Sequence, residues 1–183
     1  INQPDANTWH WQGFRHTYSN PIVIAGPISY NDAGPCHVRI KNVTSTGFEF
    51  KIEEWDYLDG IHGTEDFYYI VMEAGSYIVD GLHVEVGRIG VNNNFIYVAY
   101  PNAFSNTPAV LTQVMSYNDP SAVVTRVRTA DANGFEVMVQ EEEGNDGVHG
   151  YETVGYIAFE PGLGMSNGTR FEVARTGMAV SSQ

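Results

Sequence analysis

Several features that would point to particular kinds of protein are scarce in this sequence. Its single cysteine, Cys36, excludes an internal disulfide and a zinc site built from several thiolates. Only nine of its 183 residues are Lys or Arg, against 22 Asp or Glu, and the formal net charge is −13. Because nucleic acids and anionic lipid surfaces are bound mainly through basic side chains, neither is an expected partner. No segment approaches the roughly 20 apolar residues that cross a bilayer, so we expect no membrane insertion.

Motifs of common catalytic sites are also missing. The sequence contains no Gly-x-Ser-x-Gly, no His-Glu-x-x-His and no phosphate-binding loop. Carboxylates are adjacent at Glu53-Glu54 and Glu141-Glu142-Glu143, but neighbours along a strand face opposite sides of the sheet. Glycoside hydrolysis needs two carboxyl groups that converge across a cleft. We therefore predict that the chain is not an enzyme.

What the sequence does contain is an internal repeat. Shifted by 87 residues, it aligns with itself without a gap from Pro21 to Gly90, and 25 of these 70 positions are identical. The best-matched blocks are Ser29-Tyr30-Asn31-Asp32 with Ser116-Tyr117-Asn118-Asp119, and Asp59-Gly60-Ile61-His62-Gly63 with Asp146-Gly147-Val148-His149-Gly150. A gapless match of this length predicts two copies of one module. We place the first copy at residues 1–91 and the second at 92–183, on either side of a turn-forming run at Asn92-Asn93-Asn94.

A hydrophobic period of two predicts strands within each copy. Apolar and polar residues alternate in segments 37–41, 48–53 and 82–86, and Gly-containing turns such as Asp80-Gly81 and Asn133-Gly134 separate the strands. No segment shows a sustained helical period. About six short strands per copy indicate an all-β fold of two tandem antiparallel β-sandwich repeats, which we expect to be related by a pseudo-twofold axis.

The same alternation predicts which side chains are buried. One face of each sheet should pack into the core and the other should be solvated, so Arg39 and Arg126 are expected to point outward. The predicted core residues are Phe48, Ile70, Val86, Phe135, Ile157 and Val173.

Two sets of residues carry a resemblance to a known family. In the first copy they are Asn20-Pro21-Ile22-Val23, Val38-Arg39-Ile40, Thr44-Ser45-Thr46-Gly47-Phe48, Trp55 and Tyr69-Ile70-Val71-Met72-Glu73. In the second copy they are Pro108-Ala109-Val110, Arg126, Asn133-Gly134-Phe135 and Tyr156-Ile157-Ala158-Phe159-Glu160. On these residues each copy resembles the H-type lectin repeat, the module of snail agglutinin and of the C-terminal part of discoidin. It also resembles bacterial extracellular repeats that accompany polysaccharide-degrading enzymes.

The resemblance implies a six-stranded antiparallel sandwich that binds N-acetylgalactosamine or galactose. The family's site uses an Asp near the N-terminus, the Arg of the strand before Gly-Phe, and a Trp-His pair after it. Arg39 and Arg126 match that Arg, and Trp55 matches the Trp. Asp56 stands where the family has His, and Glu142-Glu143 replaces the pair in the second copy. No residue matches the N-terminal Asp, so the sugar specificity is not carried over.

The repeated Asp-Gly-x-His-Gly-x-Glu element is the main candidate for a sugar site. Polar side chains on its Gly-shaped turn could hydrogen-bond sugar hydroxyls, while Trp55 or Tyr57 stacks on the ring. The alternative is that Asp and His hold the turn together and that Glu pairs with Arg39 or Arg126. The candidate ligand-binding residues are Arg39, Trp55, Tyr57, Asp59, His62, Glu65, Arg126, Glu142, Asp146, His149 and Glu152.

Acidic side chains around this element make calcium a candidate ligand. Oxygen ligands are concentrated in two groups, Asp56, Asp59 and Glu65 in the first copy and Glu142, Glu143, Asn145, Asp146 and Glu152 in the second. The spacing is not that of an EF-hand. The alternative is a solvated acidic loop without an ion.

Together these observations predict a non-catalytic carbohydrate-binding module that acts outside the cell. Its partner would be a polysaccharide or oligosaccharide, with a galactose-based or algal glycan favoured. The module would belong to a longer secreted chain with a catalytic domain that degrades the polysaccharide. The alternative is a structural or adhesive repeat of a cell-surface protein, in which the repeated loops serve only to join the copies.

Overall fold

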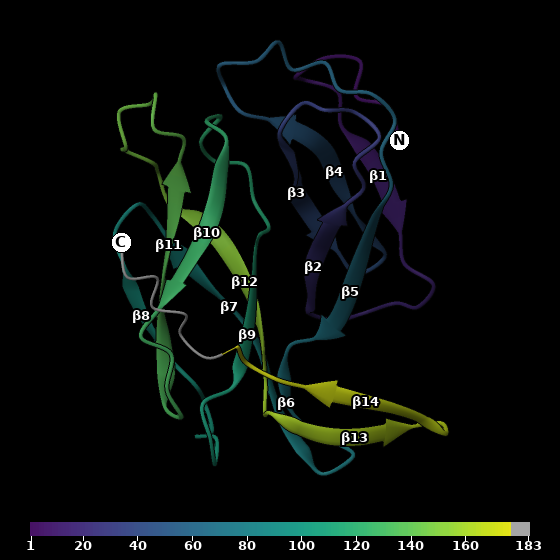
Figure 1. Ribbon diagram of the computed structural model, residues 1–183, viewed down its shortest axis with the longest axis vertical. Coiled ribbons are helices and arrows are strands. Elements are labelled where there is room, and N and C mark those ends of the chain that lie inside the picture. The colour runs from purple at the N-terminus through teal and green to yellow at the C-terminus, as the bar shows by residue number, and fades with distance from the viewer. Residues whose placement is uncertain (177–183) are drawn as a thin grey trace.

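The computed structural model describes residues 1–176 and confirms an all-β fold with antiparallel sheets (Figure 1). No helix among these residues is long and apolar enough to cross a membrane. The strands are β1 (His10–Gly13), β2 (Pro21–Ile28), β3 (Cys36–Thr44), β4 (Gly47–Glu54), β5 (Phe67–Glu73), β6 (Gly75–Val79), β7 (Leu82–Val91), β8 (Ile96–Ala99), β9 (Ala109–Val114), β10 (Val123–Arg128), β11 (Gly134–Glu141), β12 (Glu152–Phe159), β13 (Gly162–Ser166) and β14 (Thr169–Val173).

The strands recur at the spacing of the sequence repeat. A three-stranded sheet of order β1-β4-β3 corresponds to a second sheet of order β8-β11-β10. The β2–β5 pair corresponds to β9–β12, and the registers agree: Ile24 lies opposite Ile70, and Leu111 lies opposite Ile157. The β6–β7 and β13–β14 hairpins also correspond, since β6 and β13 begin 87 residues apart.

The predicted alternation in β4 and β11 places aromatic and branched side chains in two hydrophobic cores. Phe48 and Phe135, at equivalent positions, are both fully buried, as predicted. Phe48 packs edge-to-face against Tyr69, with 5.2 Å between ring centroids, and Phe135 packs in the same way against Tyr156 at 5.3 Å. Such contacts add to the free energy gained from removing the rings from water.

The β6–β7 hairpin leaves the first copy and joins a sheet of the second. From Val84 to Val91, β7 pairs antiparallel with β12 and so completes the sheet β6-β7-β12-β9. Val84 and Val86 are buried in one cluster with Ile22 from β2 and Ile157 from β12. The sheet therefore crosses the boundary that the sequence predicts between residues 91 and 92.

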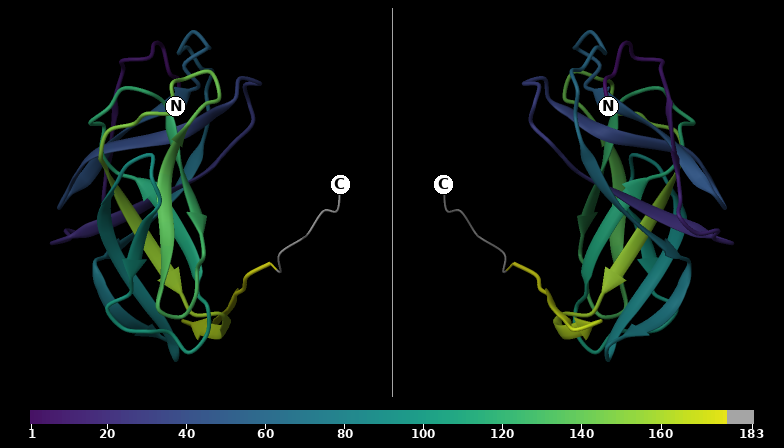
Figure 2. Two further views of the ribbon diagram at one scale, coloured as in Figure 1. Left: turned by 90° about the vertical axis from the view of Figure 1, so that its left-hand side faces the viewer. Right: turned by 90° about the vertical axis from the view of Figure 1, so that its right-hand side faces the viewer.

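The equivalent hairpin β13–β14 has no such partner among the described residues. Its two strands pair only with each other. The hairpin, yellow in Figures 1 and 2, lies at one end of the molecule. Two predicted core residues are consequently wrong: Val173 on β14 is only half-buried, and Ile70 on β5 is 52% exposed, whereas Ile157 is 2% exposed. The side chain of Ile157 packs in the cluster with Ile22 and Val86, whereas Ile70 points away from the core and no described residue covers it in the same way.

The prediction of an outward Arg39 is also wrong. Arg39, Lys51 and Glu53 lie on the face of the β1-β4-β3 sheet that the alternation assigned to solvent, yet all three are buried. Residues Tyr117–Pro120 of the second copy cover this face. No described residue covers the equivalent face of the β8-β11-β10 sheet in this way, and Arg126 is exposed there as predicted. Because the contact is not reciprocal, the predicted pseudo-twofold relation is wrong as well.

Candidate functional site

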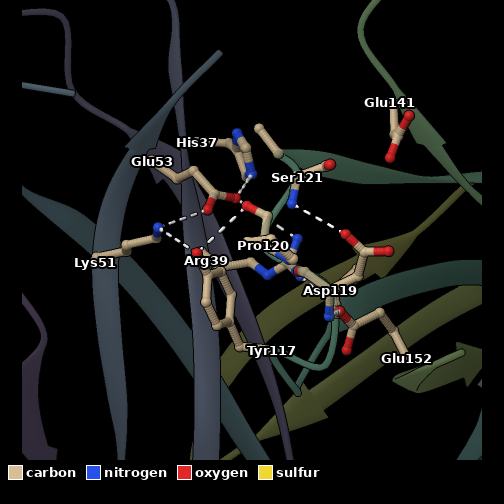
Figure 3. A network of polar contacts seen from close by, with 12 residues as sticks. His37, Arg39, Lys51, Glu53, Tyr117, Asp119, Pro120, Ser121, Glu141 and Glu152 are labelled. Carbon is tan, nitrogen blue, oxygen red and sulfur yellow. Dashed lines mark hydrogen bonds and ion pairs between the residues drawn. The ribbon is translucent and has the colours of Figure 1, made fainter. Parts of the chain in front are cut away.

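The junction between the two copies is built around the buried guanidinium group of Arg39 (Figure 3). Its Nη2 lies 2.8 Å from Oε1 of Glu152 on β12, and its Nη1 lies 3.6 Å from Oε2 of Glu53 on β4. Removing one member of a buried ion pair leaves the other charge buried without a partner. This lowers the stability of the fold far more than the loss of a surface pair does. The Arg39–Glu152 pair therefore fixes how the second copy sits on the first.

Glu152 is held by a loop of its own copy. Its carboxylate accepts hydrogen bonds from the Ser116 hydroxyl and from the backbone N–H groups of Asn118, at 3.0 Å, and Asp119, at 3.1 Å. Glu65 repeats this arrangement in the first copy, where it accepts from the Ser29 hydroxyl and from backbone N–H groups. The repeated Glu thus binds the repeated Ser-Tyr-Asn-Asp loop in each copy.

The repeated histidines complete the same internal network. His149 lies between Oε1 of Glu141, at 3.0 Å from Nδ1, and Oε1 of Glu152, at 3.3 Å from Nε2. His62 lies between Glu54 and Glu65 at 3.1 and 3.4 Å. These histidines and Glu65 and Glu152 are all buried. They cannot reach a sugar at the surface. Their placement fits the alternative in which these side chains hold the turn together and Glu pairs with an arginine.

The aspartates of the repeated element stabilise its turn. Oδ1 of Asp59 accepts the backbone N–H of Ile61 at 2.9 Å, and Oδ1 of Asp146 accepts that of Val148 at 2.8 Å. Such bonds are a common reason for Asp in tight turns. Both aspartates remain exposed.

Two grooves at equivalent positions flank this network. The first has a volume of about 160 Å³ and is lined by Trp55, Asp59 and residues of β4, and the second copy's Tyr117 and Pro120 close one side of it. The second has a volume of about 530 Å³ and is lined by Arg126, Glu142 and Asp146 together with Phe95, Met138 and Gln140. The second copy thus retains an open groove where the first copy is filled.

The ring of Tyr117 closes one side of the first groove and narrows it. The ring lies edge-on to Trp9, with 5.0 Å between centroids. The Nζ of Lys51 is 4.7 Å from the ring centroid, and the guanidinium carbon of Arg39 is 5.2 Å from it. Cation–π contacts of this kind are strongest where water is excluded. Tyr30, the equivalent residue of the first copy, is 82% exposed.

The structure therefore divides the predicted site residues. Arg126, Glu142 and Asp146 come together in the open groove, and Trp55 and Asp59 line the filled one. Trp55 is half-buried against His37, with 5.4 Å between ring centroids, and Tyr57 is exposed but lines neither groove. The prediction did not include Tyr117 or Phe95. The exact repetition of Ser-Tyr-Asn-Asp was the signal for the Tyr117 loop.

The acidic groups proposed for calcium are largely engaged in protein contacts. Asp56 accepts hydrogen bonds from the Ala122 backbone and the Asn145 side chain, which joins the copies. A different group, Asp119, Glu141 and His149, brings ligand atoms within 4.8 Å of one another. Calcium binding stays a prediction.

Hydrogen bonding lowers the pKa of several of these carboxyl groups. The pKa of Glu65 lies below its usual range, mainly because the Ser29 hydroxyl donates to the carboxylate, with burial acting in the opposite direction. Burial also raises the pKa of Glu53, but His37, Arg39 and Lys51 outweigh it, so the net shift is downward.

The comparisons with known proteins do not assign the chain to a family. No family model and no solved structure matches it. A curated relative is halomucin of Haloquadratum walsbyi, which is 36% identical over 175 residues and aligns with 88% of this chain. The chain spans 2% of the length of that relative.

We predict that Arg39→Ala destabilises the protein far more than Arg126→Ala, although the two arginines are equivalent in the repeat. Loss of Arg39 leaves Glu152 buried without its cation and should lower the free energy of unfolding by about 3 kcal/mol. Loss of the exposed Arg126 should change it by less than about 0.5 kcal/mol. Urea denaturation at neutral pH measures both values, and equal effects would contradict the assigned role of Arg39.

Acid should destabilise the protein because the pKa of Glu65 is lower in the folded state than in the unfolded one. The resulting stabilisation is complete above the unfolded pKa, near about 4.3, and is lost as pH falls through the folded pKa. Ser29→Ala removes the largest cause of the shift. The variant should therefore lose less stability than the wild type between about pH 6 and about pH 3.

Urea titrations at both pH values, with NMR titration of the Glu65 carboxyl, provide the measurement. Ser45→Ala, at an exposed position in the turn between β3 and β4, is the control and should behave as the wild type. An unchanged Glu65 titration in Ser29→Ala would show that the hydroxyl does not set this pKa.

Proposed function

We propose that the chain is a structural repeat unit of a long extracellular protein, in which two copies act as one stiff segment. The observation that carries this proposal is β7, which belongs to the first copy by sequence and completes a sheet of the second. The buried Arg39–Glu152 pair crosses the same junction. Catalysis is no part of the proposal.

The relative is consistent with this role. Halomucin is far longer than this chain. This chain matches only 2% of its length, so a chain of that size has room for many further segments. A unit whose copies share a sheet and a core suits a long chain, because the junction between copies cannot act as a free hinge.

Carbohydrate binding is a second candidate function, and the open groove of the second copy favours it. Its lining combines a cation, an aromatic ring and an amide, from Arg126, Phe95 and Gln140. Oε2 of Glu142, also in the lining, is buried and accepts no hydrogen bond from the described residues. A sugar hydroxyl could donate to it once the partly buried Glu142 side chain turns toward the groove. A polysaccharide with several repeating units fits an open groove of this kind.

The structural proposal predicts that the two copies unfold together. Trp9, Trp11 and Trp55 all lie in the first copy, so tryptophan fluorescence reports on that copy and, through the contact of Trp9 with Tyr117, on the junction. Phe135→Ala leaves a cavity in the core of the second copy and should cost about 3–5 kcal/mol. Since unfolding of the second copy removes the partners of β7 and Arg39, the fluorescence midpoint in urea should fall together with the circular dichroism midpoint.

Phe48→Ala, the equivalent substitution in the first copy, is the positive control and must shift the fluorescence transition under either model. A fluorescence transition that stays at the wild-type urea concentration in Phe135→Ala would show two independent domains. The proposed stiff unit would then be wrong.

The carbohydrate proposal predicts retention on immobilised galactose-based or algal polysaccharides such as agarose and porphyran. Arg126→Ala should weaken retention at least about tenfold, because a charged hydrogen bond to the ligand is lost. Arg170→Ala, an exposed arginine on β14, is the matched control and should bind as the wild type. Parallel measurements with EDTA test the calcium prediction. Absence of retention on every glycan tested would remove this candidate.

A further inference from the structure

The outer edge of β5 is an unfilled strand position. β5 and β12 are equivalent and pair in the same register with β2 and β9, but β12 is also paired with β7 on its other side. No described strand pairs with that side of β5. An exposed strand edge presents unpaired backbone N–H and C=O groups, which another strand can bind. Tyr68 and Ile70, on the face of β5 that points away from the core, are both more than half exposed.

The β13–β14 hairpin carries the strand that would fit. Residues Phe171-Glu172-Val173-Ala174-Arg175 repeat Val84-Glu85-Val86-Gly87-Arg88, the segment of β7 that pairs with β12. Val84 and Val86 are buried in the cluster with Ile22 and Ile157, while Phe171 and Val173 on the β13–β14 hairpin are only half-buried. β14 therefore has the same apolar pattern as β7, but among the described residues it pairs only with β13.

We propose that β14 of one molecule adds to the outer edge of β5 in a second copy of this chain, as β7 adds to β12 within one molecule. The register follows from the repeat: Phe171 lies opposite the partner's Met72, and Val173 opposite the partner's Ile70. Main-chain hydrogen bonds supply the attraction, and the apolar side chains supply the register. This inference extends the proposed structural role from the junction inside the unit to the junction between units.

A second contact supports the same orientation independently. If the copies of two molecules meet as the two copies of one molecule do, the exposed Tyr30 loop enters the open groove beside Phe95 and Arg126. That placement repeats the seat of Tyr117 in the first groove. Arg126 then approaches the partner's Glu65, whose loop already has the geometry that Glu152 presents to Arg39. A strand edge and a groove that are both empty are filled by one head-to-tail contact.

Charge sets the conditions under which this contact is measured. Each chain has a formal net charge of −13, so two copies repel each other at low ionic strength. In about 1 M NaCl the Debye length is about 3 Å, and this long-range repulsion is screened. The contact consists of backbone hydrogen bonds and apolar burial, with one short-range ion pair, and it persists in salt. Self-association should therefore increase with ionic strength.

Sedimentation velocity of the full chain tests the proposal at protein concentrations up to about 1 mM, where weak interfaces are populated. The wild type should form dimers and longer species in about 1 M NaCl. Val173→Asp blocks the donor strand and Ile70→Asp blocks the acceptor edge, and each should weaken self-association at least tenfold. An equimolar mixture should form a dimer that grows no further, because it contains one intact donor and one intact acceptor.

Leu163→Asp places the same charge on β13, the other strand of the hairpin, at an exposed position, and should associate as the wild type does. Far-UV circular dichroism establishes that each variant is folded. A wild type that stays monomeric throughout overturns the proposal, as do variants that associate normally or a mixture that forms no dimer. A monomer whose two copies still unfold together refutes the docking and leaves the proposed function intact. Independent unfolding of the copies refutes that function, whatever the association state.

Discussion

One strand, β7, contributes side chains to both hydrophobic cores, and the rest of the molecule depends on this arrangement. In the second copy, β7 arrives from the first copy and extends the sheet of β9 and β12. The same strand places Val84 and Val86 in the cluster that contains Ile22 and Ile157. Cohesion within a copy and cohesion between copies are thus supplied by one element. Neither can be removed without weakening the other.

The buried charges follow from this arrangement. Once β7 brings the copies together, the polar face of the β1-β4-β3 sheet is enclosed, and Arg39 needs an anion at the junction. Glu152 provides it, and the N–H groups of the Ser-Tyr-Asn-Asp loop hold Glu152 in place. The same side chains in the other pairing, Arg126 and Glu65, have no such contact between them. Residues at equivalent positions therefore contribute differently to the free energy of unfolding, because only one of them is covered by the other copy.

Much of the fold could be predicted from the sequence. The period-two pattern identified strands such as β4 and β11, and the placement of Phe48 and Phe135 is confirmed. The errors have one origin. Ile70, Val173 and Arg39 were assigned from alternation within a single copy, but their burial depends on whether a strand or loop of another copy covers them. Alternation distinguishes the two faces of a strand and contains no information about what lies over the second face.

The candidate site was predicted in part for a similar reason. The repeated His and Glu stood out because both copies retain them, yet retention marks residues needed for folding as readily as residues that bind a ligand. His62 and His149 lie in internal networks, while Arg126, Glu142 and Asp146 do line an open groove. The first groove depends on the placement of Tyr117, and the repeated Ser-Tyr-Asn-Asp motif does not indicate which copy's tyrosine makes this long-range contact.

The lack of reciprocity at the junction has a consequence for size. A symmetric contact uses the same surface on both partners and is exhausted after one pairing. Here the surfaces are unlike, so every added copy consumes one and presents another. Such a contact does not limit how many copies can join, so the size of an assembly depends on the number of copies present.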